Sequence, residues 1–185
     1  GRFLRAGPAY GGSCFPKDTK GLVSASNKFK VNLSLVKTVI KSNENRVNLL
    51  IQRVHKILGK KLKNKRIAFL GVTFKPNTDD MRDSSSLKMI PYLSKKGAKL
   101  SYYDPSGEKN EFKKIKNCSY KTNIKSNCHN ADLIIILTEW DEFKSLDFKK
   151  IVKNKQVKIY DLRNLYNVKD MKKNKLKYYS VGRSS

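Results

Sequence analysis

A single cysteine in a glycine- and proline-rich stretch is the first candidate for chemistry. Residues 6–21 read AGPAYGGSCFPKDTKG, with Cys14 followed closely by Lys17 and Asp18. A nearby cation favours the thiolate, which is the nucleophilic form of cysteine, and a carboxylate can accept a proton or orient a water molecule. The glycines let the backbone approach a ligand closely, and the prolines restrict the turns. The stretch predicts a nucleophilic cysteine, with a buried cysteine in a tight loop as the alternative.

A second chemically informative segment follows a predicted strand. FKPNTDDMRD, residues 74–83, places Lys75 and Arg82 in a rigid turn ahead of a serine-rich helix start. Backbone amides and basic groups in such a turn can hold an anionic phosphate. An ordinary strand–helix loop with surface charges is equally compatible with this segment alone. It is not a G-x-G-x-x-G fingerprint, so that rule predicts no cofactor here.

From residue 65 onwards, short apolar runs alternate with helical segments. We expect strands in RIAFLGV, KLSYYDP, DLIIILT and, as the last one, VKIYDLRN. We expect helices in SSSLKMIPYLSKKG, in GEKNEFKKIK and before DLIIILT. This alternation predicts an α/β fold with a doubly wound, Rossmann-like parallel sheet. Ligands of such sheets bind beyond the carboxyl ends of the strands, which here carry GVTFKPNTDDMRD, YDPS, TEWDEF and DLRNL.

One long amphipathic helix precedes the sheet. Between residues 33 and 59, apolar side chains recur at steps of three and four, with Asn32 as the expected cap and Gly59 as the stop. Such a helix is about 39 Å long. That length suits a linker between two globular halves or the seam of a dimer.

Composition limits the other classes of function. The net charge is +26, but the lysines are spread along the chain and no aromatic stripe alternates with them, so a specific nucleic-acid binder is the weaker interpretation. Three cysteines at irregular spacing argue against a disulfide scaffold and favour a reducing cytoplasm. A zinc site from Cys118, Cys128 and His129 fits no common spacing and lacks a fourth ligand. No apolar run is long enough to span a membrane.

The two motifs together resemble a known family. GPAYGGSCFPKDT resembles the active-cysteine loop of the UDP-glucose/GDP-mannose dehydrogenase family, and FLGVTFKPNTDDMRDSSSL resembles its second hallmark. DLRNLY and SVGR resemble the closing segments of the same family. The resemblance covers essentially the whole chain but only the carboxyl-terminal half of a family member. Because the chain opens inside the cysteine loop without a methionine, we expect a fragment.

The resemblance implies a domain plan. Residues 1–30 are expected to hold the catalytic cysteine loop and the start of the central helical region. Residues 31–59 are expected to form the long linking or dimerisation helix, and residues 60–185 the UDP-sugar-binding α/β domain. The amino-terminal NAD-binding domain of the family is expected to be absent.

The resemblance also implies a reaction. It is the NAD-dependent oxidation of the C6 hydroxyl of UDP-glucose to the carboxylate of UDP-glucuronate, through a thiohemiacetal and a thioester on Cys14. A thiol suits this chemistry because an alcohol nucleophile would form a less activated ester. The family implies a homodimer that binds UDP-glucose and NAD and no metal. A non-catalytic sugar-nucleotide-binding module, or a dehydrogenase for another nucleotide sugar such as GDP-mannose, is the alternative, and we expect the isolated chain to be inactive.

Individual roles follow from the positions that match the family. Cys14 and Asp18 are the expected catalytic residues, with Asp18 positioning the hydrolytic water. Lys17 and Arg82 are expected to contact NAD. The expected substrate-binding residues are Phe3, Leu4, Arg5, Ala6, Gly7, Gly11, Phe74, Lys75 and Arg163. Ala9 stands where the family commonly has glycine, which would cost about 1 kcal/mol if that position required positive φ.

Overall fold

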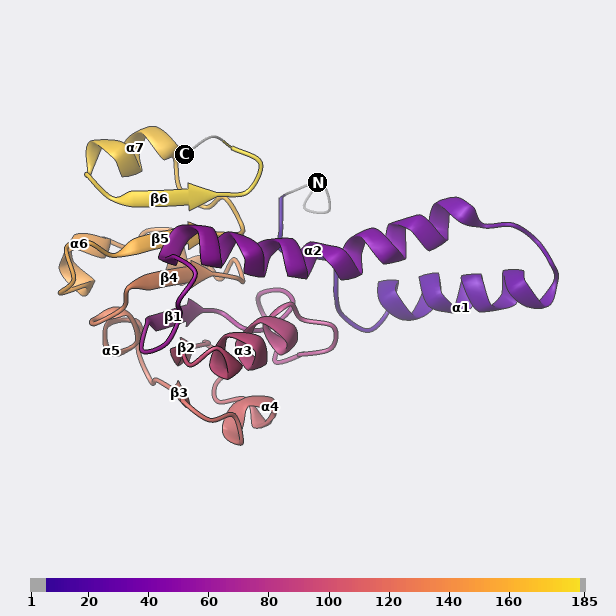
Figure 1. Ribbon diagram of the computed structural model, residues 1–185, viewed down its shortest axis with the longest axis horizontal. Coiled ribbons are helices and arrows are strands. Elements are labelled where there is room, and N and C mark those ends of the chain that lie inside the picture. The colour runs from indigo at the N-terminus through magenta and orange to yellow at the C-terminus, as the bar shows by residue number, and fades with distance from the viewer. Residues whose placement is uncertain (1–5, 184–185) are drawn as a thin grey trace.

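The computed structural model describes residues 6–183, which build a six-stranded sheet preceded by a pair of helices (Figure 1). The strands lie in the order β3-β2-β1-β4-β5-β6, and every neighbouring pair is parallel. Their bounds are β1 Arg66–Leu70, β2 Lys99–Tyr103, β3 Cys118–Tyr120, β4 Leu133–Ile136, β5 Lys158–Asp161 and β6 Lys177–Ser180. The first strand, β1, lies inside the sheet; β2 and β3 are added on one side of it, and β4, β5 and β6 on the other. This change of side between β3 and β4 confirms the predicted doubly wound, Rossmann-like α/β fold.

Helices α1 Phe15–Lys28 and α2 Ser34–Leu58 precede the first strand. Further helices connect the parallel strands, because a parallel pair cannot be joined by a tight turn. They are α3 Ser86–Lys95, α4 Asn110–Lys113, α5 Ile124–Cys128, α6 Phe148–Ile151 and α7 Val168–Lys173, with a 3-10 turn η2 at Asp141–Phe143. Among the described residues, no helix is both long enough and apolar enough to cross a membrane.

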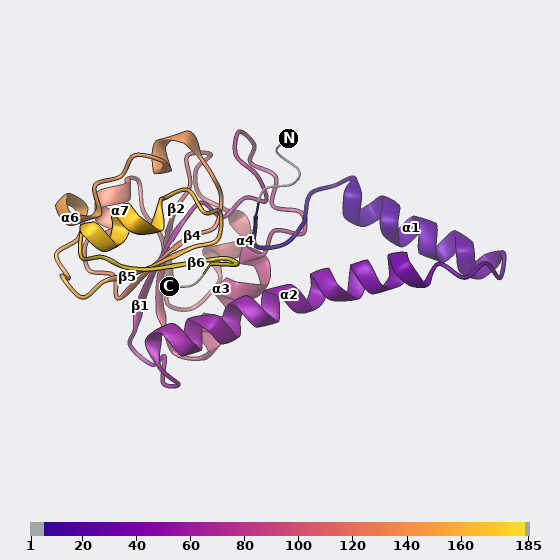
Figure 2. The ribbon, with the colours of Figure 1, turned by 90° about the horizontal axis from the view of Figure 1, so that it is seen from above.

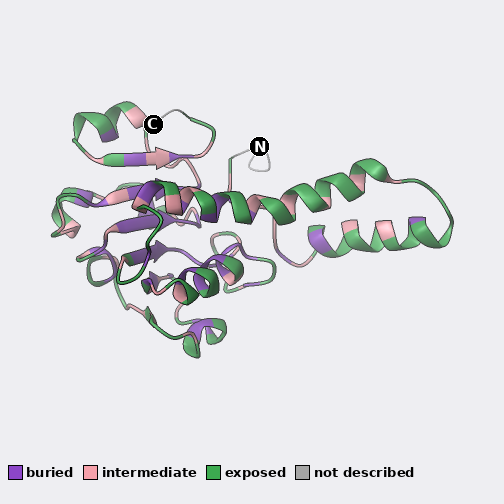
Figure 3. Ribbon diagram, viewed as in Figure 1, coloured by how far each residue is buried: buried purple, intermediate pink, exposed green. Residues whose placement is uncertain are grey.

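The sheet separates two apolar layers. Figure 3 shows that its central strands are buried. Val54 of α2 and Leu93 of α3 pack on one face, against strand residues such as Phe69. Phe148 of α6 and Met171 of α7 pack on the other face. The continuous apolar runs in β1 and β4 follow from this arrangement, because strands buried on both faces have no solvent side.

Helix α1 and the amino-terminal half of α2 lie side by side and project away from the sheet (Figures 1 and 2). Only the carboxyl-terminal half of α2 is in the core, whereas Leu35 in its first turn is 78% exposed. The 25 residues of α2 give a length of about 38 Å. Gly59 ends the helix with a positive φ, as expected, but the expected cap is wrong: the N-cap is Leu33, and Asn32 lies one residue too early to cap α2.

The sheet is wider than the sequence indicated. The segment VKIYDLRN was expected to be the last strand, but α7 and β6 follow it and extend the sheet by one strand. Strand β3 at the opposite edge was also not expected. Both edge strands are short; β3 has no fully buried residue, and β6 has buried residues at every second position, so they lack the continuous apolar run that marks the central strands.

Candidate active site

The cysteine loop, residues 6–14, lies against the loop that follows β1. The backbone N–H of Gly12 donates to the carbonyl oxygen of Arg82 at 2.8 Å. Cys14 is the N-cap of α1, and its side chain is exposed. The predicted cysteine loop therefore meets the predicted phosphate-binding loop at the carboxyl edge of the sheet, and the alternative of a buried structural cysteine is wrong for Cys14.

Two glycines permit this close contact. A Cβ on Gly11 would lie 2.5 Å from the carbonyl oxygen of Asp83. Gly12 has a φ of +86°, and a Cβ there would lie 2.7 Å from the ring of Phe74. Ala9 is not among the residues with positive φ, so alanine carries no backbone strain at this departure from the family pattern.

The loop after β1 is held from inside the fold by Asp104 at the end of β2. The buried carboxylate of Asp104 accepts hydrogen bonds from the backbone N–H groups of Val72, at 2.7 Å, and Thr73, at 3.3 Å. It also accepts bonds from the N–H and hydroxyl of Ser106. In dinucleotide-binding Rossmann sheets an acidic residue near this position binds a ribose. Here Asp104 orders the chain's own loop.

Arg163 joins three loops at the same edge. Its Nε donates to the carbonyl oxygen of Leu137 at 2.8 Å, and its Nη2 donates to the carbonyl oxygen of Phe74 at 2.9 Å. The Oε2 of Glu139 lies 2.7 Å from Nε, and only 13% of the Arg163 side chain is exposed. Burial lowers the pKa of Arg163, while Glu139 and Asp161 act in the opposite direction. Nη1 faces Gly7, where a Cβ would lie 3.1 Å away.

Asp161, the last residue of β5, orders the turn that carries Arg163. Its buried carboxylate accepts hydrogen bonds from the hydroxyl of Tyr178 at 2.7 Å and from the backbone N–H groups of Arg163 and Leu165 at 2.9 and 2.7 Å. Burial raises the pKa of Asp161, and these hydrogen bonds act against that effect. The turn after β5 is thereby ordered before any ligand binds.

Exposed cations surround the cysteine loop. Arg82 makes two side-chain hydrogen bonds to the Asp80 carboxylate, at 2.9 and 2.8 Å, and these bonds lower the pKa of Asp80. The pKa of Arg82 is raised chiefly by the bond to Asp80, and Cys14 is close enough to contribute to the same shift. The Nζ of Lys75 lies 5.3 Å from the ring centroid of Phe74. Lys17 is also exposed, 3.5 Å from the Asp18 carboxylate.

The structure brings most of the predicted site residues together. Each of seven predicted residues either belongs to the cysteine loop or to the loop after β1, or contacts one of these two loops. They are Gly7, Gly11, Cys14, Phe74, Lys75, Arg82 and Arg163. Ala6 is exposed at the start of the described chain, and the predicted residues Phe3, Leu4 and Arg5 lie outside the described residues. The sequence analysis named the segments YDPS and TEWDEF, but it did not single out Asp104 or Glu139 within them.

The other cysteines and the possible metal ligands are separate from this edge. Cys128 is buried and Cys118 is half-buried, and burial raises the pKa of each thiol to about 12. Within residues 6–183, no group of three or more His, Cys, Asp or Glu side chains is placed to hold a metal ion. Cys14 is the one cysteine of the three with an exposed side chain.

Comparison with known proteins places both segments in one family. Residues 68–168 match the UDP binding domain of the UDP-glucose/GDP-mannose dehydrogenase family, and residues 1–45 match its central domain. The UDP-glucose 6-dehydrogenase of Rhizobium meliloti is 40% identical over 183 residues, which are 98% of this chain and 42% of that protein. UDP-glucose 6-dehydrogenase TuaD of Bacillus subtilis is 34% identical over 98% of this chain and 40% of its own length.

Solved structures agree with the sequence relatives. A UDP-glucose dehydrogenase from Pyrobaculum islandicum superposes with a TM-score of 0.77 at 26% identity, covering 95% of this chain and 38% of that one. A UDP-D-ManNAc dehydrogenase from Pyrococcus horikoshii gives 0.75 at 26% identity, with 96% and 40% covered. This chain spans about two fifths of the length of these relatives.

Gly12→Ala should separate the cysteine loop from the loop after β1, because a Cβ would meet the Phe74 ring and the left-handed φ would be strained. Hydrogen exchange of residues 7–13 should accelerate about tenfold or more. Gly21→Ala is the matched control, since no heavy atom lies within 4 Å of a Cβ there, inside α1. It should stabilise the helix by about 0.5–1 kcal/mol. Equal exchange in both variants would contradict the proposed contact.

Acidification should weaken the Asp80–Arg82 pair. Because the folded-state pKa of Asp80 is lowered, its contribution is present above the unfolded value of 3.8 and is lost as the pH falls through the folded pKa. The free energy of unfolding of wild type should therefore exceed that of Asp80→Asn above about pH 4, and the difference should close at lower pH. Asp79→Asn, at the adjacent exposed carboxylate, is the control and should show no such closing difference. A wild-type advantage that persists at pH 2, measured by denaturant titration, would rule out this effect.

Proposed function

Because the chain belongs to the UDP-glucose/GDP-mannose dehydrogenase family, we propose that it is the part of a UDP-glucose 6-dehydrogenase that carries the nucleophile and binds the nucleotide sugar. The observation that supports this most directly is the placement of Cys14. It is an exposed thiol at the carboxyl edge of a doubly wound sheet, where such folds bind their ligands. The identity of 40% to a UDP-glucose 6-dehydrogenase favours UDP-glucose over GDP-mannose as the substrate.

The loop after β1 has the chemistry to bind the diphosphate of the nucleotide sugar. Lys75 is exposed, and no ion pair occupies its ammonium group within the described residues. The backbone around it is ordered by Asp104 and Arg163, so a bound anion would meet a preformed surface. Arg163 has its Nε and Nη2 bonded to the protein, which leaves Nη1, beside Gly7, for a ligand.

Cys14 forms the covalent intermediate in the proposed reaction. Its sulfur adds to the aldehyde carbon at C6, a C–S bond forms, and the carbonyl oxygen takes up the proton as a thiohemiacetal hydroxyl. After the second oxidation the carbon is held as a thioester, which water attacks. The C–S bond then breaks, and the sulfur leaves as a thiolate, a better leaving group than an alkoxide.

In this proposal Asp18 assists the hydrolysis. It lies one helical turn after Cys14, and its backbone N–H donates to the carbonyl oxygen of Cys14 at 2.8 Å. Residues four apart on a helix share a face, so the carboxylate and the sulfur lie on the same side of α1. A carboxylate there can orient the water and accept its proton.

The residues of this sheet do not form a dinucleotide site of their own. No G-x-G-x-x-G follows β1, and the Asp104 carboxylate already accepts hydrogen bonds from the chain. Lys17 and Arg82, both exposed near Cys14, do fit the negative charge of NAD approaching from the cysteine side. NAD, when bound, would accept the hydride that each oxidation removes from C6.

The helix pair also supports the proposed homodimer. Apolar side chains on α1, α2 and the turn between them are exposed, among them Leu22, Phe29, Val31, Leu35 and Val39. Exposed apolar patches of this kind mark association surfaces. The three cysteines are free thiols, which agrees with the cytoplasmic location proposed for such an enzyme.

Titration of UDP-glucose into the chain, followed by calorimetry, tests the binding function. We expect binding, weakened tenfold or more by Lys75→Ala, which corresponds to about 1.4 kcal/mol. Lys169→Ala on α7 removes the same charge from an exposed position outside the cysteine loop and the loop after β1, and should change the affinity less than twofold. Absence of binding, or equal weakening by both substitutions, would count against the proposed site.

Cys14→Ser tests the covalent role. The assay uses this chain joined to an amino-terminal part of the kind present in its longer relatives, with UDP-glucuronate formation as the readout. Acid formation should fall to background, and the affinity for UDP-glucose should stay within about twofold because the sulfur makes little ground-state contact. Cys118→Ser is the matched control and should keep its activity. Unchanged acid formation by Cys14→Ser would remove this sulfur from the mechanism.

A further inference from the structure

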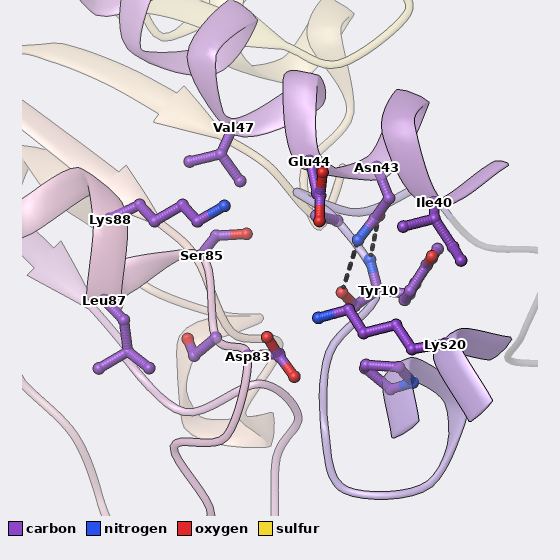
Figure 4. A pocket seen from close by; sticks show the side chains of 13 residues that line it. Tyr10, Lys20, Ile40, Asn43, Glu44, Val47, Asp83, Ser85, Leu87 and Lys88 are labelled. Atoms are coloured by element: carbon purple, nitrogen blue, oxygen red, sulfur yellow. Dashed lines mark hydrogen bonds between the residues drawn. The ribbon is translucent and has the colours of Figure 1, made fainter. Parts of the chain in front are cut away.

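Helix α2 contacts the cysteine loop through a side chain that pairs with both polar groups of one residue. The Oδ1 of Asn43 accepts a hydrogen bond from the backbone N–H of Tyr10 at 2.9 Å, and Nδ2 donates to the carbonyl oxygen of Tyr10 at 3.1 Å (Figure 4). The carboxamide thus reproduces the two-bond pairing of neighbouring β-strand residues. These two hydrogen bonds restrain both the position and the orientation of the Tyr10 backbone.

Arg46, nearly one turn further along α2, holds the other end of the same loop. Its Nε and Nη2 both donate to the carbonyl oxygen of Gly7, at 3.2 and 2.9 Å. Hydrogen bonds from a charged donor are stronger than those between neutral groups. Asn43 and Arg46 together therefore fix residues 7–10 to α2.

The helix that makes these contacts is itself anchored in the core. Val47, Leu50 and Val54 follow on α2, and all three are buried against the sheet. On its far side the loop is bonded through Gly12 to Arg82. The cysteine loop is therefore hydrogen-bonded to α2 on one side and to the loop after β1 on the other, and both of these elements belong to the packed domain.

Packing alone does not hold the loop, because a hollow lies beside it. A cavity of about 150 Å³ separates Ala9 and Tyr10 from the start of α3, where Ser85 and Leu87 line it (Figure 4). The buried hydroxyl of Ser85 has no hydrogen-bond partner within the described residues. Ala9 packs against the apolar core, but the hollow leaves this packing incomplete, so the hydrogen bonds from α2 add a restraint that packing alone does not supply.

We propose that Asn43 and Arg46 are positioning residues: by holding the cysteine loop, they fix the distance between the Cys14 sulfur and a sugar bound at the edge of the sheet. The part that concerns the sugar rests on the proposed function, whereas the restraint of the loop does not. Neither side chain belongs to the cationic loop that binds the diphosphate. Their loss therefore misplaces the sulfur and leaves the affinity for the nucleotide itself in place.

Hydrogen exchange of this chain tests the restraint without any ligand. Asn43→Ala and Arg46→Met should each accelerate exchange of residues 7–12 by about tenfold, as expected for the loss of two hydrogen bonds. Exchange in β1 and β4 should stay unchanged. Asn45→Ala and Lys41→Met, at exposed positions of the same helix, are the matched controls and should change the loop by less than twofold.

Asn43→Asp distinguishes positioning from a general loss of stability. A carboxylate can still accept a hydrogen bond from the Tyr10 N–H but cannot donate one to the Tyr10 carbonyl oxygen. The cysteine loop of Asn43→Asp should therefore exchange at a rate between those of wild type and Asn43→Ala. Unchanged loop exchange in Asn43→Ala and Arg46→Met would overturn the proposal. So would a uniform acceleration across the whole sheet, because that is the mark of global destabilisation.

Protection of Cys14 from iodoacetamide by UDP-glucose tests where the sulfur lies. At neutral pH Cys14 is the thiol that reacts, because burial raises the pKa of Cys118 and Cys128 to about 12. UDP-glucose should slow alkylation of wild type fivefold or more, and less than twofold in Asn43→Ala and Arg46→Met, with an unchanged Kd for UDP. Full protection in these variants would overturn the proposed role. Absence of protection in wild type would count against the proposed function alone, and the exchange measurement would then decide on the restraint.

Discussion

The close approach of two backbone segments underlies the whole site. Residues 7–12 can lie on the loop after β1 because Gly11 and Gly12 place no Cβ against Asp83 and Phe74. The hydrogen bond from Gly12 to Arg82 then brings Cys14 to the carboxyl edge of the sheet. Without this contact, Cys14 and the cationic loop would belong to separate parts of the molecule. The absence of a Cβ at both positions is therefore required for this contact, at a cost in chain entropy.

The edge of the sheet is ordered mainly by buried charges that bond to backbone groups. Asp104 accepts from the loop after β1, Asp161 accepts from the turn after β5, and Arg163 donates to two carbonyl oxygens on neighbouring loops. A buried charge is tolerable only when such bonds replace its hydration. The exposed cations Lys75 and Arg82 therefore lie on loops that the chain's own buried groups hold in place.

Helix α2 has different tasks along its length. Its carboxyl-terminal half packs on the sheet, its middle holds the cysteine loop through Asn43 and Arg46, and its first turns expose apolar side chains beside α1. One helix therefore connects the packed sheet, the cysteine loop and the exposed apolar surface.

The sequence alone determined the central strands, the cysteine loop and the family. Continuous apolar runs mark β1 and β4 because both faces of a parallel strand are buried, and the stretch around Cys14 is recognisable from residue types at short spacing. Tertiary structure decided the rest. The pairing of Asn43 with Tyr10 spans 33 residues, and the hydrogen bond from Arg163 to Phe74 spans 89. Periodicity reports local burial, whereas such bonds depend on which distant backbone groups the packed sheet brings within reach.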